Sequence, residues 1–181
     1  MIYLYLAQGF EEIEALATVD ILRRCEFDVV TVGVGSQDIT GAHDITVLAD
    51  TVDNMAAPTD DVQAVVLPGG MPGTLNEEKS EYVQKMIDFC VQNDKLVCAI
   101  CAAPSILGHK GLLNGKRATC FPGFEQELVG AEYSGNQAEK DGNIITGKGA
   151  GAVFDFAFEI ASALGKGAKA KKVKESMQCA K

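Results

Sequence analysis

A cysteine at the junction between an apolar run and a predicted helix is the residue best placed for nucleophilic chemistry in this chain. The run Leu96–Ile100 predicts a buried strand, Cys101 follows it directly, and small residues with Pro104 then predict the start of a helix. A side chain at such a turn stands above the sheet, and the first free N–H groups of the helix point toward it. These groups favour negative charge, and cysteines so placed have pKa values of roughly 3.5–7.5. We therefore expect Cys101 to be a thiolate at neutral pH.

The remaining cysteines are expected to fill the core, because free cysteine is among the most buried residue types. Cys98 lies within the apolar run, so its pairing with Cys101 does not match a dithiol redox motif, in which both cysteines flank the helix start. No second close pair of cysteines or histidines accompanies them, so we expect no metal site. The six cysteines are Cys25, Cys90, Cys98, Cys101, Cys120 and Cys179.

Three glutamates, Glu11, Glu12 and Glu14, follow the first predicted strand at the start of a predicted helix. Acidic side chains in a first helical turn are favoured by the helix dipole, which explains all three without any chemistry. A carboxyl group held near a thiol in an apolar setting would instead have a raised pKa and could shuttle protons. Helical periodicity predicts that either Glu14 or Glu12 lies beside the thiol, with Glu14 only slightly favoured, and the pattern does not choose between them.

A glycine-rich loop, Pro68–Gly73, follows another buried run. Glycine allows the backbone to approach a ligand closely, so N–H groups of this loop and that of Ala102 can form an oxyanion hole. The loop lacks the Lys-Ser/Thr of a P-loop and the spacing of a dinucleotide fingerprint, so a plain tight turn is the alternative interpretation. The two histidines, His43 and His109, are expected to be surface or loop residues, and no Cys-His-acid triad is predicted.

The elements that position these residues alternate between apolar strands and amphipathic helices. Such strands indicate a parallel sheet that helices cover on both faces, with ligands bound at the carboxyl ends of the strands. We predict one doubly wound α/β domain over residues 1–181. Residues 39–49 are expected to form a hairpin-like excursion, and residues 140–143 a turn. The predicted strands cover residues 2–6, 28–34, 64–67, 96–100 and 144–146, and the predicted helices residues 10–24, 80–93 and 152–164.

The composition restricts the partners and the compartment. A net charge of −9 argues against nucleic-acid binding, which depends on clustered lysine and arginine. No apolar run approaches the ~20 residues of a membrane span, and the chain start carries no signal-peptide pattern. Cysteines without a disulfide-like spacing suggest a reducing compartment, so the cytoplasm is expected. The lysine-rich end, residues 166–181, is expected to be a solvated helix face.

Five short motifs in this order resemble those of the ThiJ/PfpI superfamily, and in particular its branch of the Parkinson-disease protein DJ-one type. The resemblance spans nearly the whole chain and implies a flavodoxin-like fold. It also implies a homodimer, with the first helix and the arginines Arg23 and Arg24 near the interface. His43 stands where the family has a partner arginine. The motifs are GFEEIE at residues 9–14, LPGGMPG at 67–73, AICAAP at 99–104, ATCFPG at 118–123 and TGKGAG at 146–151.

The same resemblance assigns roles to site residues. It makes Cys101 the reactive, easily oxidised nucleophile and Glu14 its protonated partner. The backbone N–H groups of Gly70 and Ala102 would bind an oxyanion or a cysteine sulfinate, and no cofactor is implied. Phe121 stands where some members have a histidine, which argues against a protease-like or triad-dependent activity.

The activity implied is that of a cysteine-dependent, cofactor-independent glyoxalase or deglycase. Its substrates would be methylglyoxal, glyoxal or early glycation adducts on protein side chains, and the cysteine would add to the aldehyde carbon. The alternative is an oxidative-stress sensor or chaperone-like protein that works through oxidation of Cys101 to the sulfinate. Both functions use the same residues, so the sequence does not separate them.

Overall fold

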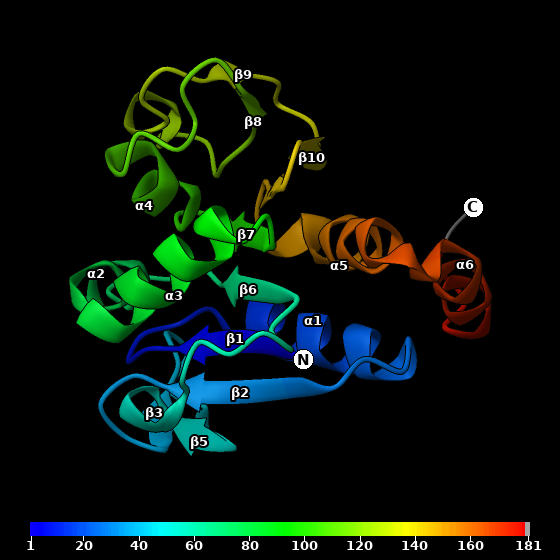
Figure 1. The fold of residues 1–181 in the computed structure, drawn as a ribbon. Helices are drawn as coiled ribbons and strands as arrows, with labels where there is room; N and C mark the ends of the chain where they lie inside the picture. The colour runs from blue at the N-terminus through cyan, green and yellow to red at the C-terminus, as the bar shows by residue number, and fades with distance from the viewer. Residues whose placement is uncertain (180–181) are drawn as a thin grey trace.

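The computed structural model describes residues 1–179, which form a seven-stranded sheet between two layers of helices (Figure 1). Neighbouring strands pair in parallel, except that β10 and β11 are antiparallel. This arrangement confirms the predicted doubly wound, flavodoxin-like α/β fold. In spatial order the strands are β10 (Ala138–Asp141), β11 (Ile144–Gly147), β7 (Leu96–Ile100), β6 (Ala64–Leu67), β1 (Ile2–Leu6), β2 (Val29–Gly33) and β5 (Thr51–Val52).

Two short strand pairs lie outside the main sheet. The described residues form six α-helices, of which the first four connect strands and the last two follow the final strand. No helix among residues 1–179 is both long and apolar enough to cross a membrane. The short pairs are β3 (Asp38–Thr40) with β4 (Thr46–Leu48) and β8 (Arg117–Ala118) with β9 (Glu132–Tyr133). The helices are α1 (Glu12–Arg24), α2 (Gly73–Lys79), α3 (Glu81–Gln92), α4 (Pro104–His109), α5 (Val153–Ala161) and α6 (Gly167–Ser176), with short turns at η1 (Asp53–Met55), η2 (Glu125–Glu127), η3 (Ala150–Ala152) and η4 (Ser162–Lys166).

The sheet is buried on both faces, as the continuous apolar strands predict. On β1, Ile2 and Leu4 face one hydrophobic core, which α1, α5 and α6 cover, while Tyr3 and Tyr5 face a second core beneath α3 and α4. Side chains alternate between the two faces because successive residues of a strand point in opposite directions. The two cores hold the strand ends rigidly, so the loops that leave those ends are well positioned.

Most predicted elements are present, and three differences have a physical reason. Helix α2 was not predicted, because its seven residues follow a Gly-Gly-Met-Pro segment that resembles a turn. The helix predicted for residues 152–164 ends at Ala161, and Gly165 adopts a φ of 83° before the chain continues as α6. The predicted lysine-rich surface helix, α6, nevertheless buries Ala170 and Val173, so only part of it is solvated.

The loops after β1, β6 and β7 meet at one edge of the sheet. The chain passes from β1 to β2 on one side and later to β6 on the other, so the strand order reverses between β1 and β6. Open α/β sheets bind ligands at such a reversal, outside the carboxyl ends of the strands. Backbone hydrogen bonds join the first two loops, from Glu11 N to Gly69 O (2.9 Å) and from Gly73 N to Gly9 O (3.2 Å).

One residue of α2, Glu77, is an exception to the apolar interior. Its side chain is completely buried, and neither carboxyl oxygen has a hydrogen-bond partner among residues 1–179. Burial holds the pKa of Glu77 well above its usual range, and the negative charge of Glu14 raises it further. Glu77 is therefore a neutral carboxylic acid at physiological pH.

We predict that Glu77→Leu stabilises the fold. An unpartnered buried polar group costs roughly 1–3 kcal/mol, so the free energy of unfolding should rise by about that amount at acidic pH and by more near neutral pH. Above about pH 4, Glu77 loses its proton in the unfolded chain but keeps it in the folded protein, so the stability of the wild type falls as the pH rises. The stability that Glu77→Leu gains over the wild type should therefore be smaller below about pH 4. Urea unfolding at acidic and neutral pH measures both effects.

The variant Glu77→Gln serves as the control for this prediction. It keeps the polarity of the side chain but removes its titration, so it should lose the pH dependence without gaining the full stability. A leucine variant that is less stable than wild type at both pH values would contradict the assignment of Glu77 as an unpartnered neutral acid.

Candidate active site

Cys101 occupies a tight bend between β7 and α4, as the sequence predicts. Its φ is 66°, a left-handed conformation that residues other than glycine rarely adopt. Two backbone hydrogen bonds hold this bend, from Cys101 N to Gly147 O (2.9 Å) and from Phe121 N to Cys101 O (2.8 Å). Strained conformations of this kind persist only where surrounding structure fixes them, and they cluster at functional sites. The bend leaves Cys101 half-buried at the edge of the sheet.

Glu14 is the glutamate that lies beside the thiol. Its side chain is 1% exposed and lies close enough to the Cys101 thiol for each group to shift the pKa of the other, and its Oε2 accepts a hydrogen bond from Gly69 N at 2.8 Å. The second carboxyl oxygen, Oε1, has no partner among the described residues. Of the two glutamates that periodicity left open, the structure thus brings Glu14 to the cysteine.

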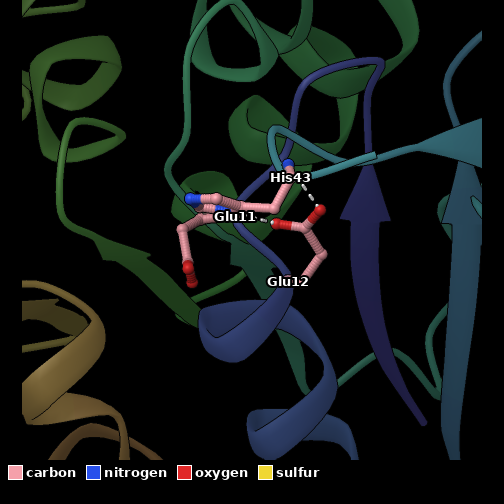
Figure 2. Close-up of side chains that lie close together, drawn as sticks. All are labelled: Glu11, Glu12 and His43. Atoms are coloured by element: carbon pink, nitrogen blue, oxygen red, sulfur yellow. Dashed lines mark hydrogen bonds and ion pairs between the residues drawn. The ribbon is translucent and has the colours of Figure 1, made fainter. Parts of the chain in front are cut away.

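Glu11 and Glu12 make other contacts. Glu11 caps α1, because its Oε2 accepts a hydrogen bond from Glu14 N at 2.7 Å. Glu12 Oε1 accepts from His43 N at 2.7 Å, and Oε2 lies 2.8 Å from His43 Nδ1. Figure 2 shows the carboxylate of Glu12 directed at His43, while that of Glu11 points away from both. Glu12 therefore anchors the β3–β4 hairpin to the start of α1.

These three side chains do not form a suitable metal site. One possible ligand atom from each of Glu11, Glu12 and His43 lies within 4.8 Å of the others. However, both carboxylate oxygens of Glu12 already contact N–H groups or the ring of His43, and the Glu11 carboxylate caps the helix. A cation would have to displace these contacts, so we assign the cluster a structural role.

Two glycines allow the carboxyl and the thiol to meet. A Cβ atom at Gly69 would lie 2.6 Å from the Cβ of Cys101 and 2.8 Å from Glu14 Oε2, closer than real contacts permit. Gly70 has a φ of 95°, which turns its N–H toward the sulfur. The N–H of Ala102 is also hydrogen-bonded to the sulfur. The sulfur thus faces one carboxyl group and two backbone donors.

The two side chains perturb one another's ionisation. Burial raises the pKa of Glu14 to about 7, although the hydrogen bonds from Cys101 and from Gly69 N–H favour its charged form. Burial also raises the pKa of Cys101 to about 12, and the charge of Glu14 acts in the same direction. The N–H groups of Ala102 and Gly70 oppose this shift but do not outweigh it.

The sequence-based prediction of a Cys101 thiolate used the helix start alone. In the structure, burial and the charge of Glu14 act on the sulfur as well, and they raise the pKa of the thiol. Helix α4 has only six residues, so its dipole opposes this shift weakly. Glu14 and Cys101 titrate as a unit, and the thiolate forms when Glu14 takes the proton.

The other predicted residues lie further away. His109 ends α4 and contacts Glu78 and Glu127, not Cys101, as its predicted surface location implies. Arg23 and Arg24, in the last turn of α1, pair with Asp50 and Asp20. Sequence reasoning missed that the backbone N–H of Phe121 donates a hydrogen bond to Cys101 O. The type of a side chain gives no signal for a backbone contact.

Comparison with known proteins places this site in a family. The DJ-1/PfpI family matches residues 1–163. Protein dj-1beta of Drosophila melanogaster is 36% identical over 163 residues, which cover 88% of this chain and 86% of the relative. A deglycase of Pyrococcus abyssi is 32% identical over 147 residues, which cover 78% of this chain and 86% of the relative. The structure of oxidised Toxoplasma gondii DJ-1 has a TM-score of 0.94 at 26% identity, and the match covers 99% of this chain and 98% of that structure. The chain belongs to the DJ-1/PfpI family.

Proposed function

We propose that the protein is a cysteine-dependent, cofactor-independent enzyme of the glyoxalase or deglycase type. Its substrates would be methylglyoxal, glyoxal or early glycation adducts. The observation that carries this proposal is the buried carboxyl group of Glu14 beside the Cys101 thiol, with the N–H groups of Gly70 and Ala102 facing the same sulfur. The relative in Pyrococcus abyssi that bears the name deglycase supports the same reaction class.

The first step is addition of sulfur to an aldehyde. Ionised Glu14 accepts the thiol proton of Cys101 while the sulfur forms a bond to the aldehyde carbon and the carbonyl electrons move to oxygen. The N–H groups of Gly70 and Ala102 stabilise the negative charge on that oxygen. Glu14 then returns its proton to the oxygen, and the product of this step is a hemithioacetal.

The second step moves hydrogen within the substrate. Glu14 removes the proton from the former aldehyde carbon, which gives an enediol, and delivers a proton to the neighbouring carbon, which gives a thioester. Water then cleaves the carbon–sulfur bond, releasing a 2-hydroxy acid and restoring the thiol of Cys101. One carbon is oxidised while its neighbour is reduced, so the reaction balances with water as the sole co-reactant. For an adduct, the same attack would release the amine or thiol.

A second function uses the same geometry. Peroxide would oxidise the thiol of Cys101 to a sulfinate, whose oxygens require hydrogen-bond donors. Gly70 N–H, Ala102 N–H and protonated Glu14 would supply them. Among the cysteines near the sheet, Cys101 is partly exposed, whereas Cys98 and Cys120 are buried. In this case the protein would act as an oxidative-stress sensor.

We also propose that the protein is a cytoplasmic homodimer. Ile13 and Leu16 on α1 are 55% and 36% exposed, and Ile45 and Leu48 in the hairpin are 53% and 69% exposed. The contact between Glu12 and His43 holds these two elements together. Large apolar side chains that are exposed on two adjoining elements suit a subunit interface. All six cysteines are free, which suits a reducing compartment.

The turnover of methylglyoxal separates the two functions. Wild-type protein should form lactate, and Cys101→Ser should lower the rate at least roughly 1,000-fold, because the nucleophile is lost. Wild type treated with peroxide should lose the same activity as mass spectrometry detects two added oxygen atoms on Cys101. Full activity of the serine variant would refute the enzyme mechanism. An inactive wild type that still gains both oxygens would favour the sensor.

The pH dependence of alkylation tests the coupling between Glu14 and Cys101. The rate at which iodoacetamide modifies Cys101 should rise with a midpoint near 7, since Glu14 accepts the thiol proton only when ionised. In Glu14→Gln the base is absent, so the neutral-pH rate should fall roughly 100-fold and recover only at alkaline pH. Mass spectrometry of the Cys101 peptide measures both profiles. The exposed Glu132→Gln is the control, and coincident profiles for wild type and Glu14→Gln would exclude the coupling.

The proposed interface predicts the effect of a buried charge. Ile13→Glu and Leu48→Glu should weaken self-association at least about 10-fold, because each places a charge in an apolar contact. Val129→Glu, at an exposed valine outside this surface, should leave the dimer intact. Sedimentation velocity over a range of concentrations measures the association. A wild-type monomer, or equal effects of all three substitutions, would rule out this interface.

A further inference from the structure

A cavity of about 400 Å³ lies between α2 and α4. Its inner wall includes Met71, which directly follows Gly70. Thr74, also in that wall, donates a backbone hydrogen bond to Gly70 O at 2.9 Å, and Ser105 Oγ donates to Ala102 O at 2.7 Å. Residues of the cavity wall are therefore hydrogen-bonded to the two residues that carry the oxyanion donors, Gly70 and Ala102.

The inner part of this cavity contains an unused hydrogen-bonding group. Thr74 is 1% exposed and lines the cavity, and its Oγ1 has no partner among residues 1–179. A buried hydroxyl without a partner is costly, and rotation of the Thr74 side chain toward the cavity would allow a ligand atom to satisfy it. The walls around it are apolar and partly open to solvent, since Met71 and Leu75 are 48% and 41% exposed. The cavity thus suits a chain-like ligand with at least one polar atom.

The rim of the cavity is negatively charged. His109 Nδ1 lies 2.5 Å from Glu78 Oε1, and Nε2 lies 2.8 Å from Glu127 Oε2. Because each ring nitrogen faces a carboxylate, both nitrogens donate and the ring is an imidazolium. One positive and two negative charges leave the rim with one net negative charge. An anionic ligand would be repelled, while a neutral or basic ligand would not.

The volume is larger than a three-carbon aldehyde requires. Cavities of roughly 300–1,000 Å³ hold ligands of drug size, so methylglyoxal bound at Cys101 would leave this space unused. We propose that the cavity is a substrate subsite for the non-reacting part of a glycated peptide, and that it favours basic or neutral segments over acidic ones. This inference rests on the proposed deglycase function and specifies its substrate class.

Binding to Cys101→Ser protein tests the subsite without any need for turnover. The probes are two tripeptides with a methylglyoxal-modified arginine, flanked either by lysine or by glutamate. Calorimetry should give a Kd that is roughly 3- to 10-fold lower for the lysine peptide. Adding Glu127→Gln should abolish this preference, whereas adding Glu132→Gln changes the net charge equally and should preserve it. Equal affinities for both peptides, or equal effects of both substitutions, would overturn the proposal.

The hydroxyl of Thr74 provides an independent check. Thr74→Val should weaken binding of the lysine peptide roughly 3- to 10-fold, and Thr74→Ser should restore it, because only the latter keeps the hydroxyl. Identical affinities for the two variants would overturn the role of Thr74. Methylglyoxal turnover by wild-type protein is measured separately, so an inactive enzyme would refute the proposed function, while loss of charge selectivity would refute the subsite.

Discussion

The contact between the Glu14 carboxyl and the Cys101 thiol is the constraint that the rest of the site satisfies. Both groups are withdrawn from water, which raises the pKa of each and makes their electrostatic interaction stronger than it would be at the surface. A carboxyl group can reach the thiol only because Gly69 has no side chain. The two strands that carry Gly69 and Cys101, β6 and β7, are neighbours in the sheet, so their ends supply this proximity directly.

The start of α1 shows how one short acidic segment performs three tasks. Glu11 caps the helix, Glu12 fixes the hairpin, and Glu14 enters the site. Residues two apart on a helix point in nearly opposite directions, so one buried glutamate would normally leave the other in solvent. Here Glu12 and Glu14 are both buried, because the β3–β4 hairpin covers one side of the helix and the glycine loop covers the other. The cap then orients the first turn, on which Glu14 depends.

Much of the fold and the position of Cys101 follow from local patterns. The uninterrupted apolar run Leu96–Ile100 predicted β7 at its observed bounds and the bend after it. The choice between Glu12 and Glu14 needed long-range contacts that periodicity does not encode, and the family resemblance supplied it. The sequence-based expectation for the pKa of Cys101 used the helix start alone, because neither the length of α4 nor the position of the Glu14 carboxylate is local information. Helix α2 was not predicted, because the Gly-Gly-Met-Pro segment before it is typical of a turn.

Several unfavourable features gather around the start of α2. Cys101 has a left-handed backbone, and Glu14 Oε1, Thr74 Oγ1 and the Glu77 carboxyl have no partners among the described residues. A fold optimised for stability alone would remove them, since each costs free energy. The fully buried strands on both faces of the sheet provide the stability that tolerates them. The unpartnered polar groups beside the strained cysteine are therefore hydrogen-bonding capacity that the structure leaves unused, at the place where the local rules of stability are broken most often.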